Sequence, residues 1–350
     1  MSLNRRTLLI AGVYSGWALA SRVSHAAELG IASLDGTPAR FVLQSRPAPG
    51  RREPPVVTCV AIQAGGDLVA VGGDDHLLRV WNFRTGQLAH ELTGHRDWIR
   101  AVLFVPGRDE LITAGNDRRL LRWTLSEGGI VHRELARHDQ AIASVAISDN
   151  GTHLAAAGFE PKMCLYNLET GEHLAQLDCP CRDIRAAAFS PNGDLLASAG
   201  RNGRVRIWAV DDLKHVRDIN AHKRRIRALA FSPDGSQLAS AGEDRTAKVW
   251  NITTGELVHS VSTGTAKILS AIYLDDAHLA TGGTDNTIRV WQLEAQRKVD
   301  KIIGHTGSIP TMVYGEQTLI SVSLDTTVRV WRPLSAVNKS TRRLDVEGLK

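Results

Sequence analysis

The stretch GEDRTAKVWN, residues Gly242–Asn251, is closely matched by GTDNTIRVWQ, residues Gly283–Gln292. Both begin with a glycine and a polar turn that contains aspartate, and both continue into a run of alternating polar and apolar residues that reaches Val-Trp. The two copies lie 41 residues apart. A turn-then-strand phrase that recurs at this distance indicates a structural unit repeated along the chain.

The aromatic anchor of this phrase recurs seven times, as Trp81, Trp123, Tyr166, Trp208, Trp250, Trp291 and Trp331. The intervals between anchors are 42, 43, 42, 42, 41 and 40 residues. Within each unit, short alternating runs are separated by turn signals such as SPDG and TTGE, which predicts four strands per unit. One such sheet cannot bury both of its faces, whereas seven sheets around an axis can.

With seven in-register copies, residues 38–332 resemble the WD-repeat β-propeller family. The resemblance implies an all-β fold over residues 37–332: a seven-bladed β-propeller of four-stranded antiparallel blades. Such rings are usually closed by an N-terminal strand that completes the last blade. The last copy stops soon after Trp331, at its third strand, and TPARFVLQS (Thr37–Ser45) matches the fourth-strand segment TGQLAHELT. We therefore expect Thr37–Ser45 to be the closing strand.

The first 26 residues have the layout of a cleaved export signal. Arg5 and Arg6 precede a mostly apolar run, Thr7 to Ala20, and small residues stand at Ser24 and Ala26. The paired arginines resemble a twin-arginine signal, with general secretion as the alternative. Residues 27–36 then form a linker, and the protein is expected in the periplasm or otherwise exported from a bacterium. The alternatives to a cleaved signal are an uncleaved anchor and a misplaced start codon. A cytoplasmic location is the alternative if the leader is not cleaved.

The formal charge of +5 is concentrated at the ends of the chain. Removal of residues 1–26 takes away three arginines and no acids, which leaves +2. The basic tail, residues 333–350, contributes another +2, so the propeller body is neutral. We therefore expect no nucleic-acid partner. After signal cleavage no transmembrane segment is expected.

Four cysteines, Cys59, Cys164, Cys179 and Cys181, are too few for a disulfide framework in a chain of this length. Cys179-Pro180-Cys181 lacks the spacing of a haem attachment site, and no second pair completes a zinc site. We expect buried, unreactive thiols at this motif; a local disulfide or a metal contact is the alternative.

Ser/Thr, His and Asp recur together in three of the units. The three sets, each with its tryptophan, are His95, Thr113, Asp117 and Trp123; His222, Ser240, Asp244 and Trp250; and His305, Ser321, Asp325 and Trp331. A catalytic triad is the alternative interpretation, but one active site does not need three copies. The resemblance implies instead that each set is a buried structural tetrad, a hydrogen-bond chain that makes its blade rigid. The other four units keep only part of the set.

Function is expected where the units differ. The contact positions that the resemblance implies on one face, the top face, carry six cations: Arg100, Arg185, Arg201, Arg225, Arg227 and Lys267. They also carry the acids Asp74, Asp183 and Glu243, and Trp98 stands beside Arg100. Arginines bind carboxylates, and an exposed aromatic can anchor a peptide. We expect an acidic protein segment to dock here; alternatively, the arginines pair with neighbouring acids and bind nothing.

A propeller enzyme would need inward-facing His, Asp or Glu from several units. The expected axial strands, such as VTCVAI, IRALAF and ILSAIY, contain none. Phosphate-loop, Rossmann and serine-elbow patterns are absent from the sequence. The sequence therefore favours a non-catalytic protein–protein interaction scaffold of the bacterial cell envelope, without a cofactor or a metal. A cytosolic adaptor is the alternative, an enzyme is less favoured, and the oligomeric state is left open.

Overall fold

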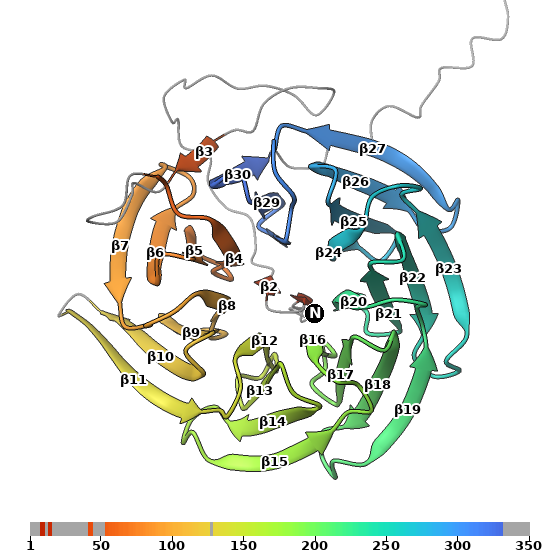
Figure 1. Cartoon of the computed structure of the whole chain (residues 1–350), viewed down its shortest axis with the longest axis horizontal. Helices are drawn as coiled ribbons and strands as arrows, with labels where there is room; N and C mark the ends of the chain where they lie inside the picture. The colour runs from red at the N-terminus through yellow and green to blue at the C-terminus, as the bar shows by residue number, and fades with distance from the viewer. Residues whose placement is uncertain (1–7, 11–12, 16–40, 45–52, 127–128, 332–350) are drawn as a thin grey trace, which may run out of the picture.

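The computed structural model describes residues 8–10, 13–15, 41–44, 53–126 and 129–331. Seven sheets surround a central axis (Figure 1), and no residue in these ranges is helical. Each blade is antiparallel, and its four strands run in order from the axis to the rim. The predicted all-β seven-bladed propeller is therefore confirmed.

The first four blades are each built from four consecutive strands. Blade 1 contains β4 (Val57–Ile62), β5 (Leu68–Gly73), β6 (Leu77–Asn82) and β7 (Gln87–Thr93). Blade 2 contains β8 (Ile99–Phe104), β9 (Glu110–Gly115), β10 (Arg119–Ser126) and β11 (Gly129–Arg137). Blade 3 contains β12 (Ile142–Ile147), β13 (His153–Gly158), β14 (Lys162–Asn167) and β15 (His173–Asp178). Blade 4 contains β16 (Ile184–Phe189), β17 (Leu195–Gly200), β18 (Arg204–Ala209) and β19 (His215–Asn220).

Blades 5 and 6 repeat this arrangement, and blade 7 closes the ring. Blade 5 contains β20 (Ile226–Phe231), β21 (Gln237–Gly242), β22 (Thr246–Asn251) and β23 (Leu257–Ser262). Blade 6 contains β24 (Ile268–Asp275), β25 (His278–Gly283), β26 (Thr287–Gln292) and β27 (Arg297–Ile303). Blade 7 contains β28 (Thr311–Gly315), β29 (Thr318–Val322), β30 (Thr327–Trp331) and, as its outer strand, β3 (Phe41–Gln44). The pairing Phe41↔Val330 to Gln44↔Thr327 confirms the predicted closing strand.

The apolar run of the expected leader contributes two short strands. β1 (Leu8–Ile10) and β2 (Val13–Ser15) pair with each other and lie at the centre of the ring (Figure 1). β1 also joins blade 5 through Ile10↔Ala230. Cleavage after Ala26 would remove both strands and leave β20 as the inner strand of blade 5. The rest of the expected leader, the linker at 27–36 and the tail at 333–350 lie outside the described residues.

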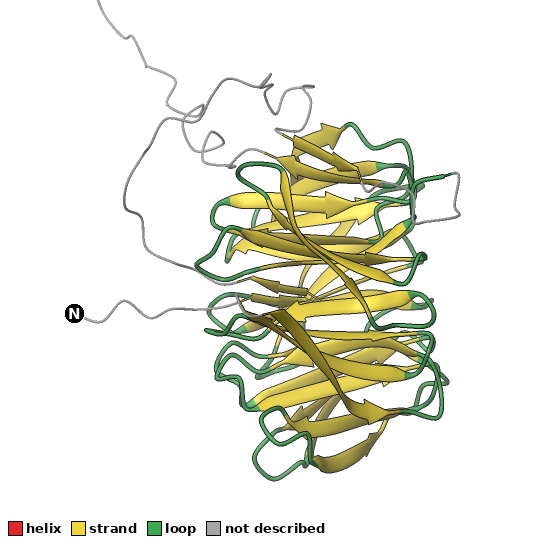
Figure 2. Ribbon diagram, turned by 90° about the vertical axis from the view of Figure 1, so that its left-hand side faces the viewer, coloured by secondary structure: helices red, strands yellow, loops and turns green. Residues whose placement is uncertain are grey.

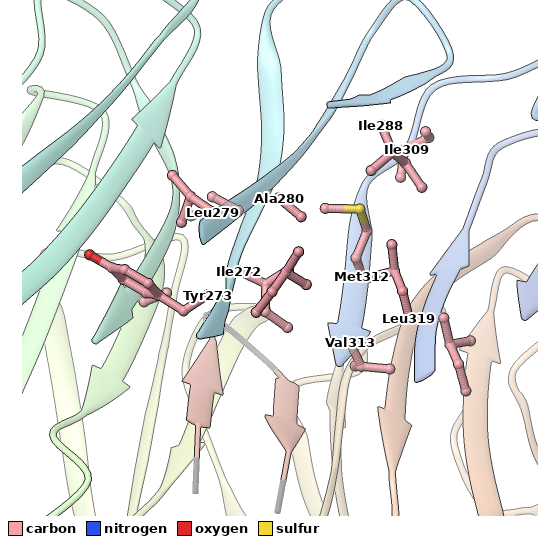
Figure 3. Packing of buried hydrophobic residues seen from close by; sticks show 14 of the residues in the cluster. Ile272, Tyr273, Leu279, Ala280, Ile288, Ile309, Met312, Val313 and Leu319 are labelled. Atoms are coloured by element: carbon pink, nitrogen blue, oxygen red, sulfur yellow. The ribbon is translucent and has the colours of Figure 1, made fainter. Parts of the chain in front are cut away.

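The core lies between the blades. Inner strands such as β8, β16 and β20 share a pattern in which every residue except the second is buried. Outer strands such as β19 bury only one residue, because their other residues face the rim. Figure 3 shows the contact between blades 6 and 7, where Ile272, Met312 and Leu319 pack together. Burial of this kind contributes roughly 25 cal/mol for each Å² of apolar surface removed from water.

The turns form the two flat faces of the disc, which Figure 2 shows from the side. Since the strands of a blade alternate in direction, the turn entering the first strand and the turn between the second and third strands lie on one face, the top face. The turns between the first and second strands and between the third and fourth lie on the opposite face, the bottom face. In the six blades 1 to 6, a β-bulge occupies the second residue of the inner strand, next to the top face. Bulges redirect side chains, and three of these residues are Arg100, Arg185 and Arg227.

Candidate functional site

Three blades contain a complete hydrogen-bond chain from the indole to the turn aspartate. In blade 5, Trp250 Nε1 donates to Ser240 Oγ at 2.9 Å, and Ser240 Oγ lies 2.8 Å from His222 Nε2. His222 Nδ1 lies 2.9 Å from Asp244 Oδ1. The equivalent contacts in blade 2 join Trp123, Thr113, His95 and Asp117, and those in blade 7 join Trp331, Ser321, His305 and Asp325.

Each of these hydrogen-bond chains stabilises its own blade from within. The hydroxyl groups in the chains are inaccessible to a substrate. Ser240, Thr113 and Ser321 are fully buried, so none of them can reach a substrate as a nucleophile. The aspartates also accept backbone N–H groups of the turn, for example from Lys223 to Asp244. Burial acts to raise the pKa of Asp325, but hydrogen bonds from Thr327 and the Thr306 backbone and the charge of His305 outweigh it and lower the pKa to about 2. The ionised carboxylate is therefore part of the folded structure.

Two incomplete blades show what the missing residues do. In blade 3, Ala156 removes the hydroxyl, and the Tyr166 hydroxyl contacts His138 Nε2 directly at 2.9 Å. A tyrosine thus replaces both the tryptophan and the serine. In blade 1, Val71 stands at the hydroxyl position, and Trp81 Nε1 is buried with no acceptor among the described residues.

Blade 4 replaces the histidine with a disulfide. Cys179 and Cys181 are bonded to each other and are both buried. The expectation of two free thiols at this motif was wrong, and the local disulfide that was its alternative is present. Cys179 Sγ lies 3.8 Å from Ser198 Oγ, where the other blades have a histidine nitrogen. The bridge therefore fixes the turn that leads into Arg182 and Asp183.

Four of the six expected top-face cations, which we call the inner cations, are paired with acids, as the alternative interpretation of these residues expected: Arg185, Arg225, Arg227 and Lys267. Arg185 donates to Asp183 Oδ2 at 3.1 Å, and Arg225 lies 3.5 Å from the same oxygen. Arg227 Nε donates to Glu243 Oε1 at 2.8 Å, and Lys267 lies 3.8 Å from Glu243 Oε2. Arg225 also lies 3.5 Å from Glu243, so one network joins blades 4, 5 and 6. Four cations share two carboxylates.

Burial and charge act against each other in this network. Burial lowers the pKa of Arg185, and it acts to raise the pKa of Glu243. The hydrogen bond from Arg227 and the neighbouring positive charges outweigh burial at Glu243 and hold its pKa below the usual value. The Glu243 carboxylate therefore stays ionised, and the four cations of the network outnumber its two carboxylates.

A second set of cations surrounds this network, and only one of them was expected from the sequence. We call them the rim cations: Arg182, Arg201, Arg204, Lys223, Arg224 and Arg245. All six are exposed, and none has a carboxylate partner among the residues that the structure describes. They lie in or next to the top-face turns of blades 4 and 5. For two of them, Lys223 and Arg224, the run HKRR at 222–225 is the sequence signal that could have identified them.

Two exposed aromatic rings each stack against an arginine on the top face. The Arg185 guanidinium lies 3.8 Å from the centre of the Phe159 ring, which is 40% exposed. In blade 2 the Arg100 guanidinium lies 4.7 Å from the Trp98 ring, and Arg100 Nε donates to Asn116. The Phe159 pair adjoins the ionic network through Arg185. No contact in the described part of the chain joins the Trp98 pair to it.

Groups of three or more His, Cys, Asp and Glu placed to hold a metal are absent from the described ranges. The same ranges contain no helix of a length and apolarity that would cross a membrane.

Comparison with known proteins agrees with this architecture. The WD domain, G-beta repeat family matches residues 49–82, 86–124, 171–209, 213–251 and 255–292, which is more than half of the chain. The chain therefore belongs to the WD40-repeat family, whose propellers are generally non-catalytic scaffolds for protein interactions. A probable serine/threonine-protein kinase PkwA of Thermomonospora curvata is 48% identical over 42 residues. That match covers 12% of this chain and 6% of the kinase, a length close to one blade.

Proposed function

We propose that this protein is a non-catalytic scaffold of the bacterial cell envelope that binds an acidic protein segment on its top face. The observation that carries the proposal is the sector of rim cations over blades 4 and 5, exposed and without carboxylate partners among the described residues. Arginine forms strong, bidentate hydrogen bonds with carboxylates. An acidic segment laid across this sector would supply the carboxylates that the blades themselves do not.

The ionic network of the inner cations also supports docking on the top face. Arg185, Arg225 and Arg227 are held by Asp183 and Glu243, so their side chains are fixed before any partner arrives. A fixed binding surface loses less conformational entropy on association. The stacked Phe159 ring offers an apolar contact at the edge of the sector, and Trp98 offers another in blade 2. We propose that both rings hold the partner by apolar contacts where it extends beyond the rim cations.

The location in the envelope rests on the N-terminal sequence alone. Arg5, Arg6 and the apolar run that follows are typical of an export signal. N-terminal sequencing of the protein from its native host tests this part, and a first residue of Ala27 is the expected result. An intact Met1 or Ser2 would favour a cytosolic adaptor.

Affinity capture from the native envelope fraction tests the docking proposal. The variant Lys223→Glu/Arg245→Glu reverses two rim cations in blade 5. The matched control Arg96→Glu/Arg118→Glu makes the same changes at the equivalent turn positions of blade 2, where Arg96 follows His95 and Arg118 follows Asp117. We expect the blade 5 variant to lose captured partner and the control to retain it. Equal retention by both variants would contradict docking on this sector.

A further inference from the structure

The two faces of blades 4 to 6 carry opposite charge. Their six bottom-face turns contain seven acids and one lysine, Lys214. The acids are Asp194, Asp211, Asp212, Asp234, Glu256, Asp276 and Glu294, and all seven are exposed. Of these, Asp212 pairs with Lys214, and Asp234 accepts hydrogen bonds from Ser232 and Ser236 within its turn. The bottom face of this sector is therefore strongly negative.

The six top-face turns of the same blades contain seven cations and four acids. Each of the four acids already has a partner within the chain. Asp183 and Glu243 hold the inner arginines, Asp244 holds His222, and Asp285 holds Arg289. The exposed charge that remains on this face is positive, and it lies on the rim cations.

From this distribution we propose that the top face of blades 4 to 6 binds the bottom face of the same blades in a second copy of this chain. The two surfaces lie on opposite sides of one disc (Figure 2), so each copy offers both. A contact between two different surfaces does not close on itself when the copies are related by translation along the axis. The product is a head-to-tail stack of discs.

Top-to-top pairing would use mainly carboxylates that already have a partner, although Asp97 and Asp139, in the top-face turns of blades 2 and 3, have no ion pair among the described residues. On the top face of the other blades, Asp75 pairs with Arg79, Asp117 with His95, and Asp325 with His305. The bottom-face turns of blades 4 to 6 carry a larger negative surplus, because their seven acids outnumber Lys214 within the turns and the adjoining Arg217 and Arg297. The stack goes beyond the proposed docking function, since it needs no other protein. A heterologous acidic partner would compete with it for the rim cations.

Sedimentation velocity of the full chain alone tests the inference. At low salt we expect the weight-average sedimentation coefficient to rise with protein concentration beyond the value of a dimer. In about 0.5 M salt it should return to the monomer value, because exposed charges are screened. The top variant is Arg182→Glu/Lys223→Glu/Arg224→Glu, and the bottom variant is Asp211→Lys/Glu256→Lys/Glu294→Lys. Each variant alone should associate about tenfold more weakly or worse than the unmodified chain.

An equal mixture of the two variants should associate again, because the reversed top of one matches the reversed bottom of the other. Thermal unfolding of each variant is measured in parallel, so that a misfolded variant is recognised and replaced by its single substitutions. Three results would overturn the inference: a monomer at every concentration in low salt, no recovery in the mixture, or dimers that the bottom variant leaves intact. Failure of the unmodified chain to capture any partner, while it still associates with itself, would affect only the proposed docking function.

Discussion

Blades 5 and 7 have the same interior and different turns. Both contain the complete chain from tryptophan to aspartate, and the corresponding hydrogen bonds differ in length by no more than about 0.1 Å. Yet residues 222–227 read HKRRIR in blade 5, and residues 305–310 read HTGSIP in blade 7. Glu243 and Arg245 of blade 5 correspond to Leu324 and Thr326 of blade 7.

The comparison shows that the buried interior and the exposed turns of one repeated unit meet different requirements. The buried hydrogen bonds need particular residue types at fixed positions, so they recur wherever the blade must be rigid. The turn tips contribute little to the blade, so their charge is available for function. Blade 5 uses that freedom for cations, whereas blade 7 fills the same positions with small and apolar residues.

The largest loss of thermal stability is expected from removal of the closing strand, which is the part of blade 7 that has no counterpart in the chain connection of blade 5. Blade 5 takes all of its outer strand from the adjacent sequence, but blade 7 takes β3 from the other end of the chain. Deletion of residues 37–45 should lower the midpoint of thermal unfolding by roughly 10 °C or more, or leave the protein insoluble, because β30 becomes an open edge. A truncated protein that unfolds at the original temperature would show that β3 does not hold the ring closed.

A smaller loss of stability, of equal size in blades 5 and 7, is expected when the buried aspartate of either blade is substituted. Asp244→Ala and Asp325→Ala should each lower the free energy of unfolding by about 1–3 kcal/mol, because each leaves a buried histidine without its partner. Urea denaturation measures both. A hydrolytic activity that Ser240→Ala abolishes at unchanged stability would contradict the structural role of these residues.

The same carboxylates predict how stability depends on pH. Asp325 has a pKa of about 2 in the folded protein, below the value near 3.9 of an unperturbed aspartate. Its contribution to stability is fully present above the unfolded pKa and is lost as the pH falls through the folded pKa. Urea midpoints should therefore decrease from about pH 4 to pH 2, and Asp325→Asn should reduce that decrease. An unchanged slope in the variant would show that other groups cause the acid unfolding.

The smallest effect concerns the backbone of one turn. Arg245 has φ = 72°, a left-handed conformation that costs a side chain about 1 kcal/mol, and the equivalent position in blade 4 is Gly203. Arg245→Gly should stabilise the protein by up to about 1 kcal/mol and weaken the capture of an acidic partner. Arg118, with φ = 66°, is the matched position in blade 2, and Arg118→Gly should stabilise without affecting capture. Loss of stability in both variants would show that the arginine side chains make favourable contacts within the fold.

Most of the fold could be predicted from the sequence because the repeat is regular. Seven anchors at nearly constant spacing fix the number of blades, and the truncated last unit requires a strand from elsewhere, which β3 provides. The replacement in blade 3 was not predictable, since no spacing rule shows that the Tyr166 hydroxyl reaches His138. The disulfide between Cys179 and Cys181 was left as an alternative, because two cysteines separated by one residue are compatible with several states.

The site was harder to predict, because the pairing of charges depends on side-chain directions. The sequence singled out Arg185, Arg225 and Arg227, and the structure places them against Asp183 and Glu243. The alternation of polar and apolar residues along a strand does not reveal β-bulges. The bulges at Arg185 and Arg227, which turn these side chains toward the acids, could therefore not be predicted. Of the rim cations, Lys223 and Arg224 stand in the same sequence run but were not singled out, because the family's contact positions do not include the turn tips.

The central claim is that the cations over blades 4 and 5, and not cations on the top face in general, bind acidic protein segments. Fluorescence anisotropy with a labelled glutamate-rich peptide measures this directly in the unmodified chain, Lys223→Glu/Arg245→Glu and Arg96→Glu/Arg118→Glu. We predict that the blade 5 variant binds about tenfold more weakly, that the blade 2 variant binds nearly as well as the unmodified chain, and that all binding fades as salt rises toward about 0.5 M. Equal affinity in the two variants, or binding that does not change with salt, would contradict the claim.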